Sequence, residues 1–137
     1  VHGDYRLDNV LIDADDRLRA VIDWEMATLG DPLTDLALLV LYQRLGVLLG
    51  GGGPVADAAC APGFLAEEEI IARYAGRSGR ELSHLGFYLG LAAFKLAVIL
   101  EGIHYRHQHG QTVGSGFEDV GAAVQPLLDA GLTSVTS

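Results

Sequence analysis

The residues VHGDYRLDN at positions 1–9 decide the fold of this chain. They contain Asp4 and, five residues later, Asn9, and a second aspartate, Asp23, ends an apolar run nineteen residues after Asp4. Between Asn9 and Asp23, two short apolar segments flank the polar turn at residues 14–17, a pattern typical of a small β-hairpin. Because a hairpin returns the chain to the end at which it began, we expect Asp4, Asn9 and Asp23 to converge.

Two aspartates and an asparagine at these spacings match the oxygen ligands of a phosphoryl-transfer site. In protein kinases the catalytic loop H-R-D-x-x-x-x-N supplies an Asp that takes the hydroxyl proton and an Asn that holds Mg²⁺, and the Asp of a later D-F-G holds Mg²⁺ again. Here Gly3 stands in place of the Arg, and residues 23–25 read Asp-Trp-Glu. The alternative is that Asp4 and Asn9 are a turn-capping pair, but the matching positions of His2, Gly3 and Asp23 would then have arisen by chance.

These motifs, continued by LGDPLTDLA at residues 29–37, resemble the aminoglycoside phosphotransferase family of choline-kinase-like small-molecule kinases. They are most similar to a branch of that family that occurs alone in bacteria and also fused to acyl-CoA dehydrogenases. The resemblance implies an α+β, mainly α fold, the C-terminal lobe of a protein-kinase-like fold, in which a small β-hairpin at the catalytic loop is followed by about four helices. It also implies that the N-terminal nucleotide lobe, which normally precedes the catalytic loop, is missing.

The whole chain, 1–137, is therefore expected to form one catalytic lobe. Residues 1–37 would hold the catalytic loop, the metal-binding segment and the first helix, 46–64 a flexible connector, and 66–131 a helical subdomain. The Gly-rich run at 50–54 lies in that connector and is not a phosphate-binding loop, because no strand precedes it and no Lys-Ser/Thr pair follows it.

Local signals place the expected helices. Asp31 as N-cap and Pro32 in the first turn open a helix. Its apolar face is formed by Leu33, Leu36, Ala37, Val40 and Leu41. The later helices are expected over about 66–78, from about Ser83 to His109 and from about Phe117 to Ala130, with a frayed tail over 133–137. The third of the four helices is apolar nearly all round, which favours the centre of the lobe.

The resemblance also implies the roles of the motif residues. Asp4 would be the general base, or at least the group that orients the attacking hydroxyl. Asn9 and Asp23 would ligate Mg²⁺, with ATP as the phosphoryl donor. His2 and Gly3 would support the catalytic loop structurally, as would Asp35, which would accept hydrogen bonds from amides of that loop; ordinary helix-start electrostatics is the alternative for Asp35.

Three further polar residues are candidates for contacts to substrate or phosphate. Arg6 and Asp8 lie within the catalytic loop, and solvent exposure is an equally open interpretation for both. Glu25 stands where kinases have the Gly of D-F-G. The histidines His104 and His107, three residues apart on the third helix, suggest a metal site, but decoration of the polar helix end is favoured because further ligands are lacking.

The composition of the chain limits the classes of partner that it is expected to bind. A net charge of −9 argues against nucleic acid and anionic membranes, which both select basic surfaces. The longest apolar stretch, Leu85 to Leu100, contains Lys95 and is shorter than the roughly 20 residues that span a bilayer. The single cysteine, Cys60, cannot form an internal disulfide, which fits the cytoplasm. The expected partners are a small-molecule hydroxyl substrate and the missing N-terminal lobe, with no nucleic acid and no membrane.

The predicted function is ATP- and Mg²⁺-dependent transfer of the γ-phosphoryl group to a small-molecule hydroxyl, with a hydroxyacyl compound suggested by the dehydrogenase fusions. The isolated piece is expected to be inactive, because half of the ATP site is absent. The alternative is a non-catalytic kinase-like module that binds nucleotide or a partner. A metal-dependent phosphohydrolase is disfavoured, because a two-metal site needs more His or Asp ligands.

Overall fold

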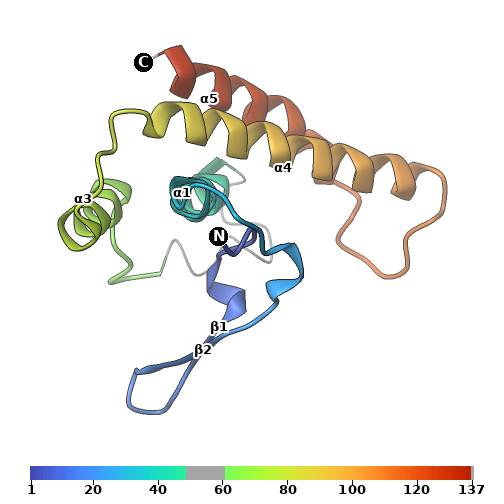
Figure 1. The fold of residues 1–137 in the computed structure, drawn as a ribbon. Coiled ribbons are helices and arrows are strands. Elements are labelled where there is room, and N and C mark those ends of the chain that lie inside the picture. The colour runs from blue at the N-terminus through green and yellow to red at the C-terminus, as the bar shows by residue number, and fades with distance from the viewer. Residues whose placement is uncertain (49–60, 137) are drawn as a thin grey trace.

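The computed structural model describes residues 1–48 and 61–136, and the described part is mainly helical with one small antiparallel sheet (Figure 1). The strands are β1 (Val10–Ile12) and β2 (Leu18–Val21), and the α-helices are α1 (Leu33–Leu48), α3 (Glu67–Ser78), α4 (Leu85–Gln108) and α5 (Val124–Thr136). Short 3-10 helices are η1 (Leu7–Asn9), η2 (Trp24–Met26) and η3 (Val120–Ala123). The α+β, mainly α class predicted from the sequence is confirmed.

The predicted hairpin is present, and it projects away from the helices (Figure 1). Val10 pairs with Val21, and an irregularity in register follows Leu11. At the open end of the hairpin the Ile22 amide donates to the Asn9 carbonyl, at 2.9 Å. This bond joins the end of the catalytic loop to the residue before Asp23, so the hairpin produces the convergence expected of it at the level of the backbone.

Helix α1 forms as its sequence predicts. The Asp31 carboxylate accepts the Leu33 amide at 2.9 Å, which satisfies a donor that the first turn leaves unpaired. All five residues of the predicted apolar face are buried. The helix continues to Leu48, so the connector predicted to begin at residue 46 begins later. A single glycine costs a helix only about 1 kcal/mol, too little for Gly46 to end it; the Gly-rich run and Cys60 lie outside the described residues.

Helix α3 also matches its prediction. Its N-terminus is closed by Glu69, whose carboxylate accepts the Ala66 amide at 2.9 Å. Gly79 ends it in the left-handed conformation, with φ of 63°. Arg44 of α1 holds it in place through two hydrogen bonds to the Glu67 carboxylate, at 2.8 and 2.6 Å. This pairing joins α3 to α1, and Ile70 and Tyr74 of α3 also pack against the core.

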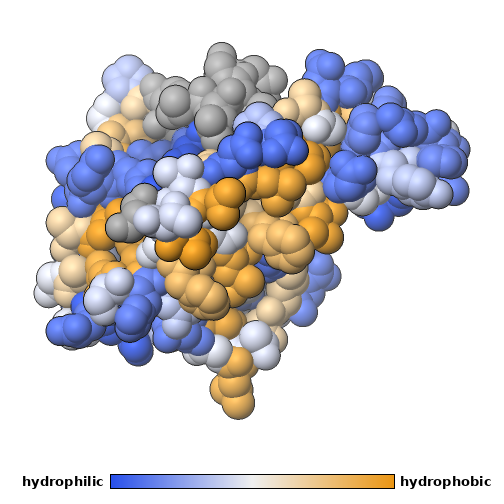
Figure 2. Space-filling view, turned by 90° about the horizontal axis from the view of Figure 1, so that it is seen from above, coloured by the Kyte–Doolittle hydropathy of each residue, from blue (hydrophilic) through white to orange (hydrophobic). Residues whose placement is uncertain are grey.

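Helix α4 is less central than its composition predicts. One face packs against α1 and α5, and its buried residues are Leu85, Leu89, Ala92, Ala93, Leu96 and Ala97. Large apolar side chains on the rest of the helix are exposed, among them Phe87, Leu91, Phe94 and Val98. The view from above, the side on which α4 and α5 lie, shows a broad apolar patch (Figure 2). The expectation that this helix lies at the centre of the lobe is therefore wrong for the described residues, among which α1, α5 and η3 pack against α4 and leave one side open.

Helix α4 is longer than the apolar stretch from which a membrane span was excluded. The apolar stretch judged too short to span a bilayer belongs to a helix of 24 residues, which is long and apolar enough to do so. A core helix of a soluble protein satisfies the same criterion, so one such helix decides nothing. Its Lys95 donates to the Gly3 carbonyl at 2.7 Å, which ties α4 to the catalytic loop. The absence of a membrane partner stays a prediction.

Helix α5 begins later and ends later than predicted. Gly114 and Gly116 take positive φ values of 100° and 97°, which keeps the segment after residue 113 out of a helix. The tail expected to fray is helical to Thr136. Its Ser134 hydroxyl donates to the Ala130 carbonyl and accepts from Arg44, each at 3.0 Å. The bond to Arg44 joins residues 90 positions apart in sequence, which is why local propensity did not predict it.

Candidate active site

The carboxylate of Asp35 anchors the catalytic loop. Asp35 lies in the first turn of α1, where one oxygen accepts the His2 amide at 2.7 Å and the other accepts the Gly3 amide at 2.9 Å. The Gly3 carbonyl is held in turn by Lys95, at 2.7 Å. Side chains of α1 and α4 thus form hydrogen bonds with the peptide units immediately before Asp4. Sequence reasoning missed Lys95, although a single lysine within an apolar helix was a usable signal for a buried polar contact.

His2 connects the loop to the residue before Asp23. Its side chain is buried, with 3% exposed, and Nε2 lies 2.8 Å from the Ile22 carbonyl oxygen. The Asp4 amide donates to Nδ1 at 3.3 Å. Because that amide can only donate, Nδ1 is the unprotonated nitrogen and Nε2 carries the hydrogen given to Ile22. His2 therefore works as a neutral spacer between the two aspartate-bearing segments.

Gly3 is required by the close approach of the η2 segment. Its φ is +86°, a value that disfavours any residue with a side chain. A Cβ built on it would lie 2.5 Å from the Met26 carbonyl oxygen, which is part of the backbone and cannot rotate away. The loop and the segment after Asp23 thus pack against each other at this glycine.

Both oxygens of the Asp4 carboxylate are held by neighbouring side chains. The buried Asn9 donates from Nδ2 to the Asp4 carbonyl at 2.9 Å and to Asp4 Oδ2 at 3.2 Å. The Tyr42 hydroxyl of α1 donates to Asp4 Oδ1, also at 3.2 Å. Burial, reinforced by the negative charge of Asp4, raises the pKa of Tyr42 to about 12. Tyr42 therefore remains a protonated donor throughout the neutral range.

Tyr42 is a site residue that the sequence reasoning missed. Asp35 and Tyr42 are seven residues apart on α1, which places them two turns apart on the same face of the helix. That spacing was the available signal, since Asp35 was already expected to face the loop. One face of α1 thus contacts the catalytic loop twice, at the amides before Asp4 and at the Asp4 carboxylate.

Arg6 lies beside Asp4 and Tyr42. Its Nε is 3.6 Å from Asp4 Oδ2, its Nη1 is 3.5 Å from Asp8 Oδ2, and its guanidinium lies 5.4 Å from the centre of the Tyr42 ring. Arg6 Nε is buried and makes no hydrogen bond within the described residues. A positive charge thus stands beside the predicted base, while Asp8 is mostly exposed and reaches the cluster only through Arg6.

Asp23 and Glu25 lie at the other side of the loop. Asp23 has left-handed backbone angles, φ 64° and ψ 58°, which are uncommon for a residue other than glycine and concentrate at functional sites. It is exposed, and its carboxylate makes no bond to another described residue. Glu25 is exposed in η2. The structure brings Asp4, Asn9, Arg6 and Tyr42 into contact and links Asp23 to them through the backbone at Ile22.

The oxygen donors fit magnesium better than zinc. In residues 1–48 and 61–136, no three His, Cys, Asp or Glu side chains form a cluster able to hold a metal. Mg²⁺ does not need one, because it takes one or two carboxylates together with phosphate and water oxygens. Since Asn9 Nδ2 is bonded to Asp4, its Oδ1 is the atom that can serve as a ligand beside Asp23.

Two of the three histidines at the end of α4 make local bonds through Nδ1, whereas Nδ1 of His104 is buried without a hydrogen-bond partner among the described residues. His107 Nδ1 lies 3.0 Å from the Thr112 hydroxyl, and His109 Nδ1 lies 2.7 Å from the Tyr105 carbonyl oxygen. The preference for a polar helix end over a metal site agrees with these contacts.

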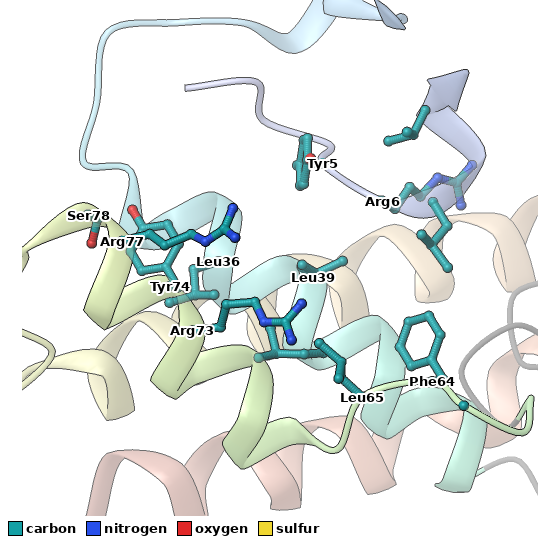
Figure 3. Close-up of a pocket in the computed structure, with 14 residues that line it drawn as sticks. Tyr5, Arg6, Leu36, Leu39, Phe64, Leu65, Arg73, Tyr74, Arg77 and Ser78 are labelled. Atoms are coloured by element: carbon teal, nitrogen blue, oxygen red, sulfur yellow. The ribbon is translucent and has the colours of Figure 1, made fainter. Parts of the chain in front are cut away.

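A pocket of about 620 Å³ opens beside the catalytic loop, between that loop, α1 and α3 (Figure 3). Tyr5 and Arg6, the two residues that follow Asp4, form part of its wall. The pocket therefore borders the part of the catalytic loop that directly follows Asp4.

Comparison with known proteins agrees with this geometry. Residues 1–78 match the phosphotransferase enzyme family. The chain belongs to this family. The match covers the catalytic loop, the hairpin, α1 and α3, so the family's characteristic region contains every predicted site residue.

The curated relatives carry dehydrogenase names. The chain is 36% identical over 138 residues to acyl-CoA dehydrogenase family member 11 of Mus musculus and 33% identical to that of Homo sapiens. It is 27% identical over 139 residues to the probable acyl-CoA dehydrogenase IBR3 of Arabidopsis thaliana. Each alignment covers 96% of this chain and 17% of the relative, so the chain spans about a sixth of their length. No solved structure gives a significant match. The resemblance to a family branch fused to acyl-CoA dehydrogenases is confirmed.

Proposed function

We propose that this chain provides the C-terminal catalytic lobe of a protein-kinase-like phosphotransferase, which uses ATP and Mg²⁺ to phosphorylate the hydroxyl of a small molecule. The observation that carries the proposal is the Asp4 carboxylate, fixed by Asn9 at 3.2 Å and by Tyr42 at 3.2 Å on a loop anchored to Asp35. Phosphoryl transfer depends mainly on positioning and charge stabilisation. A carboxylate with both oxygens held in place fits that requirement.

Each residue then has a defined task. Asp4 orients the acceptor hydroxyl and receives its proton on a carboxylate oxygen as the oxygen attacks the γ-phosphorus and the bond to the leaving ADP oxygen breaks. Asn9 Oδ1 and the Asp23 carboxylate would hold Mg²⁺, which supplies neutralisation of the phosphate oxygens when bound. Arg6 places a positive charge beside Asp4, 3.6 Å from its carboxylate.

The acceptor class and the setting are also proposals. The curated relatives are named acyl-CoA dehydrogenases, and this supports a hydroxyacyl compound as acceptor. We place the reaction in the cytoplasm. We expect no nucleic-acid partner, because the net charge is −9.

The test follows ADP release in the product of the longest reading frame that encodes this chain, with Mg-ATP and a panel of hydroxyacyl thioesters, choline-like alcohols, sugars and aminoglycosides. Asp4→Asn should lower acceptor-dependent turnover by at least about a hundredfold, the usual contribution of a general base. Asp16→Asn makes the same chemical change at an exposed hairpin residue and should leave turnover unchanged. Mg-ATP binding without turnover on any acceptor would favour the non-catalytic binding module instead.

A further inference from the structure

The pocket beside the catalytic loop has a largely apolar wall. Leu36 and Leu39 contribute to it from α1, Phe64 and Leu65 from the segment before α3, and Ile70 from α3 itself (Figure 3). Its volume of about 620 Å³ lies in the range of small-molecule sites, which are commonly about 300–1,000 Å³. These side chains offer no hydrogen bonds to a ligand, so they suit a hydrocarbon segment.

Two residues in the pocket wall connect the pocket to Asp4. Arg6 lines it and forms an ion pair with Asp4 at 3.6 Å. Leu39 also lines it and lies three residues before Tyr42, on the same side of α1, and Tyr42 donates to Asp4. The Asp4 carboxylate therefore lies one side chain away from the pocket, on the far side of Arg6.

Two arginines of α3 stand at the opposite wall. Arg73 and Arg77 both line the pocket, and Figure 3 shows their guanidinium groups directed into the space between α3 and the loop. They are four residues apart and so are neighbours on the helix surface, where like charges disfavour each other. Glu69, one turn before Arg73, is bonded to the Ala66 amide.

Neither arginine is neutralised by the described protein. Within residues 1–48 and 61–136, Arg73 and Arg77 form no hydrogen bond or ion pair. The chain holds 18 acidic residues against 9 basic ones, so carboxylate partners were abundant. Two adjacent unpaired guanidinium groups facing an apolar pocket make a binding site for an oxyanion attached to a hydrocarbon.

We infer that this pocket binds an amphipathic anion, with Arg73 and Arg77 holding its carboxylate or phosphate group and the leucine-rich wall holding its hydrocarbon part. The inference rests on the proposed function in one respect, which is that the bound anion is the phosphoryl acceptor and presents its hydroxyl to Asp4. It excludes cationic acceptors such as aminoglycosides and choline, which the two arginines would repel.

A binding experiment tests the site without turnover. The probes are octanoate, octyl phosphate, 1-octanol and octyltrimethylammonium, which share one chain and differ in the charge of the head. Calorimetry should show that at least one anion binds tenfold or more tightly than 1-octanol, and that the cation does not bind. The two anionic probes decide between carboxylate and phosphate.

The double variant Arg73→Gln/Arg77→Gln should reduce anion affinity to that of 1-octanol and leave 1-octanol binding unchanged. Its control is Arg17→Gln/Arg106→Gln, which removes the same charge at exposed positions outside the pocket lining and should bind like the wild type. The four arginines that are substituted in these variants are all exposed, so circular dichroism should report intact folding for both variants.

Equal binding of 1-octanol and the anions, tight binding of the cation, or unchanged anion affinity in the Arg73/Arg77 variant would each overturn the inference. The two proposals fail separately. Arginine-dependent anion binding with no ADP release on any acceptor supports the anion site and removes the proposed function. Turnover of cationic acceptors that is unaffected in the Arg73/Arg77 variant supports the phosphotransferase and removes the anion site.

Discussion

The catalytic loop and helix α4 are stabilised in different ways. The loop contains little apolar burial, and its backbone is held by side chains from other elements, with Asp35 accepting two of its amides and Lys95 donating to its Gly3 carbonyl. Helix α4 holds its own backbone and packs one apolar face, leaving Leu91 and Phe94 46% and 58% exposed. The conformation of the catalytic loop therefore depends on hydrogen bonds to particular side chains, whereas the position of α4 depends on the burial of one apolar face.

The largest expected effect comes from removing the anchor of the loop. Asp35→Ala leaves the His2 and Gly3 amides without their acceptor, and each hydrogen bond to a charged group is worth about 1.5–3 kcal/mol. We expect the free energy of unfolding to fall by about 3 kcal/mol or more, measured by urea denaturation. Asp35→Asn keeps one acceptor oxygen and should lie between the variant and the wild type. A loss below about 1 kcal/mol in Asp35→Ala would mean that the loop is held by other contacts.

The next comparison lies within α4. Leu89 is 6% exposed and Leu91 is 46% exposed, so the same substitution tests the buried and the open face. Leu89→Ala should cost about 2–4 kcal/mol through lost burial and a cavity, whereas Leu91→Ala should cost less than about 1 kcal/mol. Thermal and urea unfolding of the two variants measures both. Equal large losses would show that the apolar patch of Figure 2 is covered in solution.

The smallest expected effect is the pH dependence contributed by Tyr42. Its pKa is raised to about 12 in the folded chain from an ordinary value near 10, by burial first and by Asp4 second. The folded state therefore favours the protonated phenol, so the contribution is complete below pH 10 and is lost as pH rises toward 12. Wild-type stability should fall more steeply between pH 10 and 12 than that of Tyr42→Phe, in urea unfolding at each pH.

Tyr88 provides the control for that measurement. Its pKa is also raised, by its hydrogen bond to Asp31 first, but Asp31 is exposed to solvent, so Tyr88→Phe should alter the slope less. Parallel stability curves for the wild type and Tyr42→Phe would mean that Tyr42 is not held against Asp4. In that case the carboxylate would rest on Asn9 and Arg6 alone.

The catalytic loop was predictable because its signals are local and combine. The spacing of Asp4, Asn9 and Asp23, the polar turn between them and the Asp31-Pro32 helix start each constrain a few residues of backbone. The partners of the loop were only partly predictable. Asp35 was expected to face it, whereas the contacts of Tyr42, two turns further along α1, and of Lys95, on another helix, depend on how α1 and α4 pack beside the loop.

Local patterns in the chain were enough to predict the hairpin, the start of α1, the extent of α3 and the motif residues Asp4, Asn9, Asp23 and Asp35. The buried face of α4, the continuation of α5 to Thr136 and the contacts of Tyr42, Lys95 and Arg6 around Asp4 depend on tertiary packing. The difference lies in the range over which the interactions act. Capping, turns and glycine conformations act over a few residues, whereas burial and buried hydrogen bonds depend on which distant surface comes to lie opposite.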